Sequence, residues 1–219
     1  MADLIFECVD AQPDKYGVSP TLLFKLRITD PDGQPVHAIA LRCQLRIEPQ
    51  RRRYDEEEGE LLGTLFGDRS RWGDTLKPIQ FALLSVLVPS FTGSTEIDVP
   101  VPCTYDMDVT AGSYFHALQD GVVPLVFLFS GTIFGKGGAK GFSVSQVPWH
   151  QEANFRLPVK TWKELMDRYF PDTSWLRVRR DTLDALLKYN AVHALPGLDA
   201  VITSLLEQSS LKQGGEKTP

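Results

Sequence analysis

An aromatic residue next to an imidazole is the best candidate for chemistry in this sequence. Trp149 and His150 follow a proline between two segments of apolar character. A loop at the end of a strand can present an indole and an imidazole together, and imidazole is the side chain most often used for proton transfer near neutral pH. With Tyr105, these residues form a hypothetical binding site. A packing or surface role for His150 is the competing interpretation.

Other groups of reactive residues fail in detail. The glycine-rich stretch 134–141 contains two lysines, but a phosphate-binding loop needs Gly-Lys followed by Ser or Thr and a helix, whereas a strand pattern follows here. Ser94 is not part of a Gly-x-Ser-x-Gly turn. The four histidines show no metal-ligand spacing. Turn formation explains the acidic segment 30–33 better than calcium binding does. The sequence therefore assigns no catalytic residue, no metal ligand and no cofactor.

The three cysteines, Cys8, Cys43 and Cys103, are an odd number and lie far apart in the sequence. Two of them fall in strand patterns, where a reduced thiol behaves as a small hydrophobic side chain. We therefore predict free buried thiols and not a disulfide framework or a zinc site. Cys43 shares the parity of Leu41 and Leu45, which predicts that it faces the core.

The clearest structural signal lies in residues 21–48. Apolar and polar side chains alternate there in two long segments, and Asp30-Pro31-Asp32-Gly33 separates them. A period of two sends one set of side chains into a core and the other into water. Shorter runs of strand character recur between turn residues at 4–9, 79–88, 95–101, 107–118, 124–134, 141–147 and 153–157. Seven to nine strands at this spacing predict an antiparallel β-sandwich, although residues 56–66 have helical spacing.

The pattern changes at residue 158. Apolar side chains then recur every three or four residues, which predicts about three helices that begin near residues 158, 181 and 198. Helices of this length are unstable alone in water, so they should pack on the sandwich. The expected α+β chain comprises a β-sandwich (1–157), a packed helical extension (158–208) and a disordered polar tail (209–219).

Charge and hydropathy exclude several classes of function. The chain has 219 residues, a formal net charge of -5 and a pI near 5.4, which argues against electrostatic binding to nucleic acid or anionic lipid. The basic cluster 51–53 is followed by acidic residues 55–58, which predicts a solvated surface whose charges compensate one another. No secretory signal is visible at the start, so a cytoplasmic location is expected. The apolar run 122–134 is shorter than the roughly 20 residues of a membrane-spanning helix, so no membrane insertion is expected.

Segments that carry a family resemblance occur along most of the chain. They include Leu-Arg-Cys-Gln-Leu-Arg-Ile-Glu-Pro and its continuation (41–54), together with 88–95, 100–106, 128–132, 147–149 and 179–186. In these segments the chain resembles an uncharacterised bacterial family of about this length, mainly actinobacterial, which is a domain of unknown function. That family is associated with gene neighbourhoods of nickel-iron hydrogenases. The resemblance implies a hydrogenase context but no catalytic residues, and the sequence lacks the paired Cys-x-x-Cys motifs of a hydrogenase large subunit.

Two functions follow as hypotheses. The first is a non-catalytic accessory or assembly protein that binds another protein, with hydrogenase subunits or maturation factors as the partners that the resemblance implies. The second is a small-molecule-binding protein or enzyme with a pocket between the sandwich and the C-terminal helices, lined by Trp149, His150 and Tyr105. The lack of a recognisable catalytic group of residues favours the first hypothesis.

Overall fold

The structure, a computed structural model, describes residues 4–104, 109–136, 141–173, 176 and 178–214. These residues form nine strands, six α-helices and two short 3₁₀ helices. The strands are β1 (Ile5–Pro13), β2 (Thr21–Thr29), β3 (Pro35–Ile47), β4 (Ile79–Val88), β5 (Phe91–Thr92), β6 (Ser94–Pro102), β7 (Val122–Lys136), β8 (Phe142–Gln146) and β9 (Glu152–Pro158). The helices are η1 (Pro49–Arg51), α1 (Glu56–Phe66), η2 (Arg69–Arg71), α2 (Trp72–Thr75), α3 (Val109–Ala117), α4 (Val159–Tyr169), α5 (Arg180–His193) and α6 (Leu198–Gly214).

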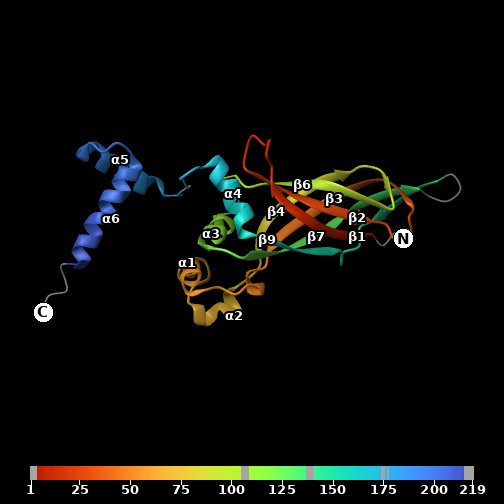
Figure 1. Ribbon diagram of the computed structural model, residues 1–219, viewed down its shortest axis with the longest axis horizontal. Helices are drawn as coiled ribbons and strands as arrows, with labels where there is room; N and C mark the ends of the chain where they lie inside the picture. The colour runs from red at the N-terminus through yellow and green to blue at the C-terminus, as the bar shows by residue number, and fades with distance from the viewer. Residues whose placement is uncertain (1–3, 105–108, 137–140, 174–175, 177, 215–219) are drawn as a thin grey trace. The chain divides into compact units, whose positions relative to one another are not determined.

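The strands form two antiparallel sheets. One sheet has three strands in the order β1-β2-β6, and the other has six, with the order β4-β3-β7-β8 and with β5 paired to β3 and β9 paired to β7. Figure 1 shows the long strands running side by side, with α1 to α4 gathered at one end of them. The predicted mixture of antiparallel sheets and helices is confirmed, and the arrangement is sandwich-like. Three of the six helices precede residue 158, so the helical content exceeds the three helices expected from the sequence.

The two amphipathic strands of residues 21–48 belong to different sheets, β2 to the first and β3 to the second. The turn between them is a corner that carries the chain across the core. The buried Asp30 carboxylate accepts hydrogen bonds from the backbone N–H groups of Asp32 (3.1 Å) and Gln34 (2.8 Å). Gly33 has a φ of 63°, which glycine adopts without strain. Local turn chemistry therefore fixes this change of sheet.

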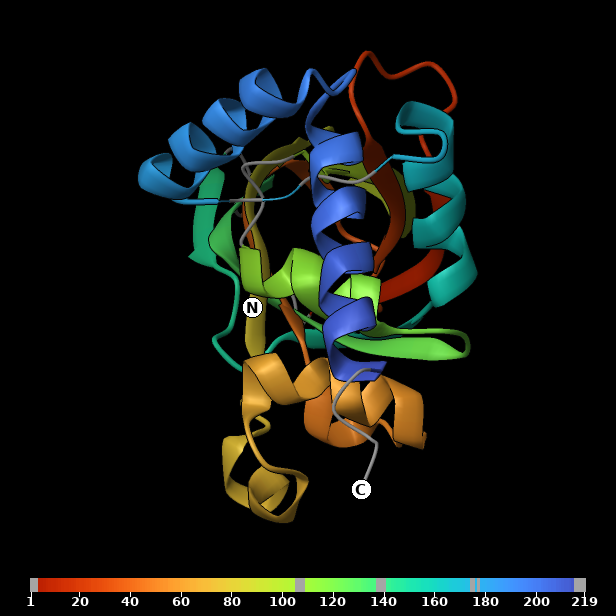
Figure 2. The ribbon, with the colours of Figure 1, turned by 90° about the vertical axis from the view of Figure 1, so that its left-hand side faces the viewer.

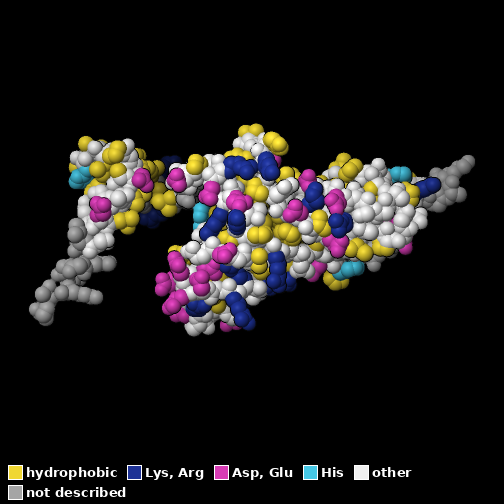
Figure 3. Space-filling view, in the orientation of Figure 1, with side chains coloured by type: hydrophobic (Ala, Val, Ile, Leu, Met, Phe, Trp, Pro, Cys, Tyr) yellow, Lys and Arg dark blue, Asp and Glu magenta, His cyan; other side chains and the backbone are white. Residues whose placement is uncertain are grey.

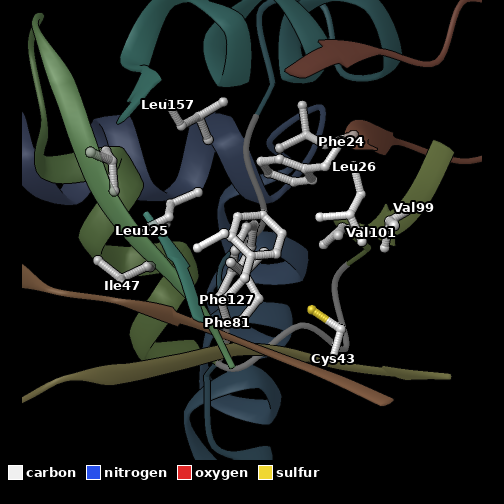
Figure 4. Close-up of a cluster of buried hydrophobic side chains, with 14 of the residues drawn as sticks. Phe24, Leu26, Cys43, Ile47, Phe81, Val99, Val101, Leu125, Phe127 and Leu157 are labelled. Carbon is white, nitrogen blue, oxygen red and sulfur yellow. The ribbon is translucent and has the colours of Figure 1, made fainter. Parts of the chain in front are cut away.

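The core lies between the inner faces of the two sheets. Phe24 from the three-stranded sheet meets Phe127 from the other at a ring separation of 5.3 Å, and Phe6 stacks on Phe129 at 4.6 Å. Figure 4 shows Phe24, Phe127 and Cys43 among the buried side chains that fill this space. Full burial of a large apolar side chain contributes about 1.5 to 3 kcal/mol. The alternation predicted for β2 and β3 is confirmed, since every second side chain is buried from Leu22 to Ile28 and from Ile39 to Ile47.

Residues 107–118, predicted as a strand, contain the helix α3, so that prediction is wrong for its described part. The buried side chains Ala111, Tyr114 and Phe115 of α3, with Leu118 just after it, recur at intervals of three and four residues, which is the period of a helix. Aromatic and β-branched residues hid this spacing because they also favour strands. Tertiary packing decided the outcome, since Phe115 stacks on Trp162 of α4 with ring centroids 5.0 Å apart.

Helix α4 packs against β1, β2 and β9, and it buries Val159, Trp162 and Leu165. Its last residue, Tyr169, donates a hydrogen bond from its hydroxyl to the Gly17 carbonyl (2.6 Å). Figure 2 shows α4 beside the strands and α1 and α2 below them. Helix α4 thus belongs to the compact unit of residues 1–173.

Residues 174–219 form a second compact unit, which contains α5 and α6. The two helices contact each other, and Gln208 donates a hydrogen bond to the Tyr189 hydroxyl (2.9 Å). Ala194, in the left-handed conformation, ends α5. Helix α6 continues to Gly214, beyond residue 208, where the polar composition predicted a tail. None of the helices in the described ranges is long and apolar enough to cross a membrane.

Candidate functional site

The outer face of the six-stranded sheet carries a band of apolar side chains. Strand pairing places Leu87 opposite Ala40, and it places Phe134 opposite both Ala38 and Val144. Residues opposite one another in a sheet share a face, so these side chains lie on the surface away from the core. Leu83 lies four residues before Leu87 on the same face of β4, and Phe142 belongs to β8. Together these side chains form what we call the outer apolar band: Ala38, Ala40, Leu83, Leu87, Phe134, Phe142 and Val144.

The larger side chains of this band face solvent. Leu83, Leu87, Phe142 and Val144 are between 58% and 72% exposed. The Phe142 ring stacks on Phe134, with centroids 5.9 Å apart. It also lies parallel to the His37 imidazole at 6.1 Å. Stacking of this kind restricts the rotation of an exposed ring, so this part of the band has a defined shape before any partner binds.

Phe142 and Val144 lie on β8, at one side of the six-stranded sheet. At the other side the outer apolar band reaches the edge strand β4. Strand β4 is hydrogen-bonded to β3 and is the last strand in its direction, so its other edge forms no ladder within the described residues. A hollow of about 360 Å³ lies between the two strands and is lined by residues that include Ala40, Arg42 and Leu87. A long edge strand with exposed leucines is a surface that another polypeptide can cover.

The sequence-predicted site residues lie elsewhere. Trp149 and His150 occupy the turn between β8 and β9, where Trp149 is 92% exposed and His150 is also exposed. Their rings are perpendicular, with centroids 5.8 Å apart, so the structure brings these two together. Neither of them lines the hollow beside β4. Tyr105 lies outside the described residues, so its place relative to the other two stays a prediction.

Gly131 of β7 lies close to the backbone of β3, and it contacts the segment that leads into the Trp149–His150 turn. Gly131 has a φ of 145° and lies where β7 changes its partner from β9 to β8. Its carbonyl accepts a hydrogen bond from the Val147 N–H (2.9 Å), just before Trp149. A Cβ atom at position 131 would lie 2.1 Å from the Ala40 carbonyl oxygen, so only glycine fits.

One residue of the basic cluster 51–53, Arg52, departs from the solvated surface that the sequence predicted, whereas Arg51 and Arg53 are exposed. The Arg52 side chain is 9% exposed and pairs with Glu58 at 2.5 Å. Its guanidinium also donates to the carbonyls of Val122 (2.9 Å) and Asp120 (2.6 Å). Positive and negative charges do compensate each other here, but they do so in a buried ion pair. Through Arg52, this pair links the start of α1 to the loop before β7. The other acidic residues of α1, Glu56, Glu57 and Glu60, face solvent, and Figure 3 shows acidic side chains gathered over that helix.

Two tyrosines extend this polar region into the core. The Tyr54 hydroxyl donates to the Pro49 carbonyl (2.8 Å), so the Tyr114 hydroxyl, 2.8 Å away, must donate to Tyr54. Burial raises the pKa of Tyr114 to about 12, and it also raises the pKa of Tyr54. Both hydroxyls therefore stay protonated at neutral pH and serve as structural hydrogen-bonding groups. Within the described ranges, no three His, Cys, Asp or Glu side chains lie together in a way that could hold a metal ion.

A family model matches residues 1–214 of the chain. The chain belongs to DUF6084, a family of unknown function. Membership in DUF6084 agrees with the resemblance to a domain of unknown function that the sequence showed. A comparison with curated proteins finds no match.

Among solved structures, β-glucosidase 3B from Thermotoga neapolitana in complex with α-D-glucose resembles part of this DUF6084 chain. The match has a TM-score of 0.26 and 13% sequence identity. It covers 71% of this chain and 17% of the glucosidase chain. A likeness at this level carries no argument about activity.

Proposed function

We propose that this DUF6084 protein is a non-catalytic binding protein that docks another protein on the outer face of its six-stranded sheet. The observation that carries the proposal is the outer apolar band. Soluble proteins rarely expose contiguous apolar patches larger than a few hundred Å², and patches of that size often serve as interaction sites. Four large apolar side chains that are more than half exposed, spread over both flanks of one sheet, make such a patch.

The composition of the band favours a protein partner over a small molecule. The band is spread across the four strands β3, β4, β7 and β8, whereas small-molecule sites are clefts that enclose most of their ligand. Aromatic side chains such as Phe134 and Phe142 are enriched at the centres of protein interfaces. The free edge of β4 would add main-chain hydrogen bonds to a partner strand.

The resemblance to a family found near nickel-iron hydrogenase genes suggests the partner. We propose hydrogenase subunits or their maturation factors, bound in the cytoplasm. An accessory protein needs no catalytic residues of its own, which is compatible with a face built from leucine, phenylalanine and valine. The large apolar content of the band would suit a partner that exposes apolar surface during assembly.

Affinity capture from the native host tests this proposal. The full-length protein should recover a defined partner, identified by mass spectrometry. The double variant Leu83→Glu/Leu87→Glu should reduce that recovery by tenfold or more, since charged groups would be buried in the interface. Val18→Glu is the matched control, because Val18 is a fully exposed apolar residue outside the band.

Two results would contradict different parts of the proposal. Equal recovery by the wild type and the double variant would show that the outer apolar band is not the docking surface. Failure to recover hydrogenase components, combined with unchanged hydrogen uptake in a deletion strain, would remove the hydrogenase partner and leave protein binding to be assigned elsewhere.

The alternative of a pocket lined by Trp149, His150 and Tyr105 gains no support from the described residues, since Trp149 and His150 are exposed on a turn. Native mass spectrometry of the purified protein discriminates between the two functions. A co-purified small molecule that is lost in the His150→Ala variant would favour the pocket.

A further inference from the structure

A cleft of about 550 Å³ lies where η1, the start of α1, the loop before β7 and strand β9 meet. Four arginines line it, Arg51, Arg52, Arg53 and Arg156. None of the residues that line this cleft belongs to the outer apolar band. The cleft is therefore a second site, independent of the proposed protein-docking face.

Each acidic side chain in this cleft already forms a hydrogen bond or an ion pair within the protein. Glu58 pairs with Arg52 and accepts from the Gln119 N–H (2.8 Å). Asp55 accepts from the Glu58 N–H (2.8 Å) as the N-cap of α1. Asp120 accepts from the Gly121 N–H (2.6 Å). No ion pair links any of these carboxylates to Arg51, Arg53 or Arg156 in the described part of the chain.

The remaining arginines keep donors for a ligand. Arg51 donates one hydrogen bond to the neutral side-chain amide of Asn154 (2.8 Å), which leaves its charge unpaired. Arg53 and Arg156 are exposed and form no ion pair or side-chain hydrogen bond within the described ranges. Each guanidinium has five N–H donors in a planar fork, which matches the two oxygens of a carboxylate or phosphate.

The wall of the cleft is held by hydrogen bonds and an ion pair, and it is partly apolar. Arg52 is held by Glu58 and by two backbone carbonyls, and its buried Nε has no partner in the described structure. The remaining lining includes Val122 and Pro124. An ordered wall lowers the entropy cost of binding, and its apolar part suits the carbon skeleton of a ligand.

We propose that this cleft binds a small molecule through an oxyanion group, either a carboxylate or a phosphate. Arg53 and Arg156 bind the charged oxygens, Arg51 contributes a further positive charge, and the Arg52–Glu58 pair holds the wall in place. The apolar portion of the ligand lies against Val122 and Pro124. This role separates the basic cluster 51–53 into one structural arginine and two binding arginines.

Titration with two probes tests the site and identifies the source of the oxyanion. Inorganic phosphate and citrate would be added to the full-length protein at low ionic strength, with potassium chloride at matched ionic strength as the reference. Backbone amide NMR shifts of residues 51–58, 119–123 and 156 report binding. Tighter binding of citrate assigns a carboxylate ligand, and tighter binding of phosphate assigns a phosphorylated one.

The variants Arg53→Gln and Arg156→Gln should each weaken binding roughly tenfold, the usual effect of losing a charge-assisted contact. Both positions are exposed, so the melting temperature should stay near that of the wild type. Arg27→Gln is the matched control. Arg27 is a half-exposed arginine that pairs with Glu96, and both residues belong to the three-stranded sheet, which contributes no residue to the cleft. Binding of neither probe, or an equal loss of binding in all three variants, would overturn the proposal.

Discussion

Among the described residues, burial alters the proton affinity of several individual side chains. Desolvation raises the pKa values of Cys8, Cys43 and Cys103 to about 12. It lowers the pKa of His116, whose ring meets Trp162 at 5.0 Å. Burial disfavours the charged form in both cases, which is the anionic form of a thiol and the cationic form of an imidazole. These groups therefore contribute to packing and to pH-dependent stability.

Cys43 should resist thiol reagents for as long as the protein is folded. The side chain is fully buried, and with a pKa of about 12 only on the order of one thiol in 10⁵ is ionised at pH 7. Mass spectrometry after native labelling should find Cys43 unmodified, whereas labelling in denaturant should modify all three cysteines. Rapid modification under native conditions would place Cys43 on the outer face of β3. It would contradict the prediction that Cys43 faces the core with Leu41 and Leu45.

The free energy of unfolding should fall on acidification partly because of His116. Its pKa in the folded state lies below its ordinary value, so the unfolded chain binds the proton more tightly. Stability is lost as the pH falls below about 6.5, the ordinary pKa of histidine, and the loss ends below the folded-state pKa. Urea unfolding at pH 7.5 and 5.5 should show a smaller pH difference for His116→Gln than for the wild type. An unchanged difference would assign the pH dependence to other groups.

At the scale of secondary-structure elements, pairing between distant strands sets requirements that single segments do not reveal. Strand β7 pairs with β3 along most of its length and with β8 and β9 on its other side, which makes it the centre of the larger sheet. Its backbone lies so close to β3 at Gly131 that a Cβ atom there would collide with the Ala40 carbonyl. By contrast, Gly63 of α1 has open space around the position of a Cβ atom. These two glycines form a natural pair for comparison.

The variant Gly131→Ala should lose about 3 kcal/mol or more of unfolding free energy, because the new Cβ would collide with the Ala40 carbonyl and the φ of 145° is strained for alanine. Gly63→Ala should gain up to about 1 kcal/mol, since alanine favours a helix interior. Chemical denaturation measures both. Equal stability of the two variants would mean that β3 and β7 do not approach each other as described.

Across the whole molecule, stability depends on how the helices join the sheets. Helix α4 buries Val159, Trp162 and Leu165 against the first unit, and each buried side chain contributes about 1.5 to 3 kcal/mol. The sequence also predicts that α5 and α6 belong to the same cooperative unit as the sheets. Two truncations separate these contributions.

A chain that ends at Leu157 loses α4 and should aggregate or melt at least about 10 °C below the full-length protein, as expected for a loss of several kcal/mol. A chain that ends at Thr173 retains α4 and should melt between the two if α5 and α6 share the cooperative unit. Calorimetry gives the three melting temperatures. If the chain ending at Leu157 is monomeric and as stable as the full-length protein, the helices form a separate module.

The sequence by itself determined those local elements that have a single clear period. The alternation of apolar side chains in residues 21–48, the strand character of residues 79–88 and the helical spacing of residues 56–66 predicted the ends of β2, β4 and α1 closely. The same alternation predicted β3 except for its first four residues. These patterns are readable because each reflects one period and one buried face. The buried position of Cys43 followed from the same parity.

Only the tertiary structure decided which elements meet. Period alone does not say that β2 and β3 belong to different sheets, because pairing depends on contacts between distant residues. The same is true of the outer apolar band, which exists only once Leu87, Phe134 and Val144 share a face. The arginine cleft shows it most clearly: Arg156 lies about a hundred residues from Arg52 and Arg53, yet all line one site. Burial of Arg52 with Glu58, which the sequence presented as solvated charge, is likewise a consequence of packing α1 against the loop before β7.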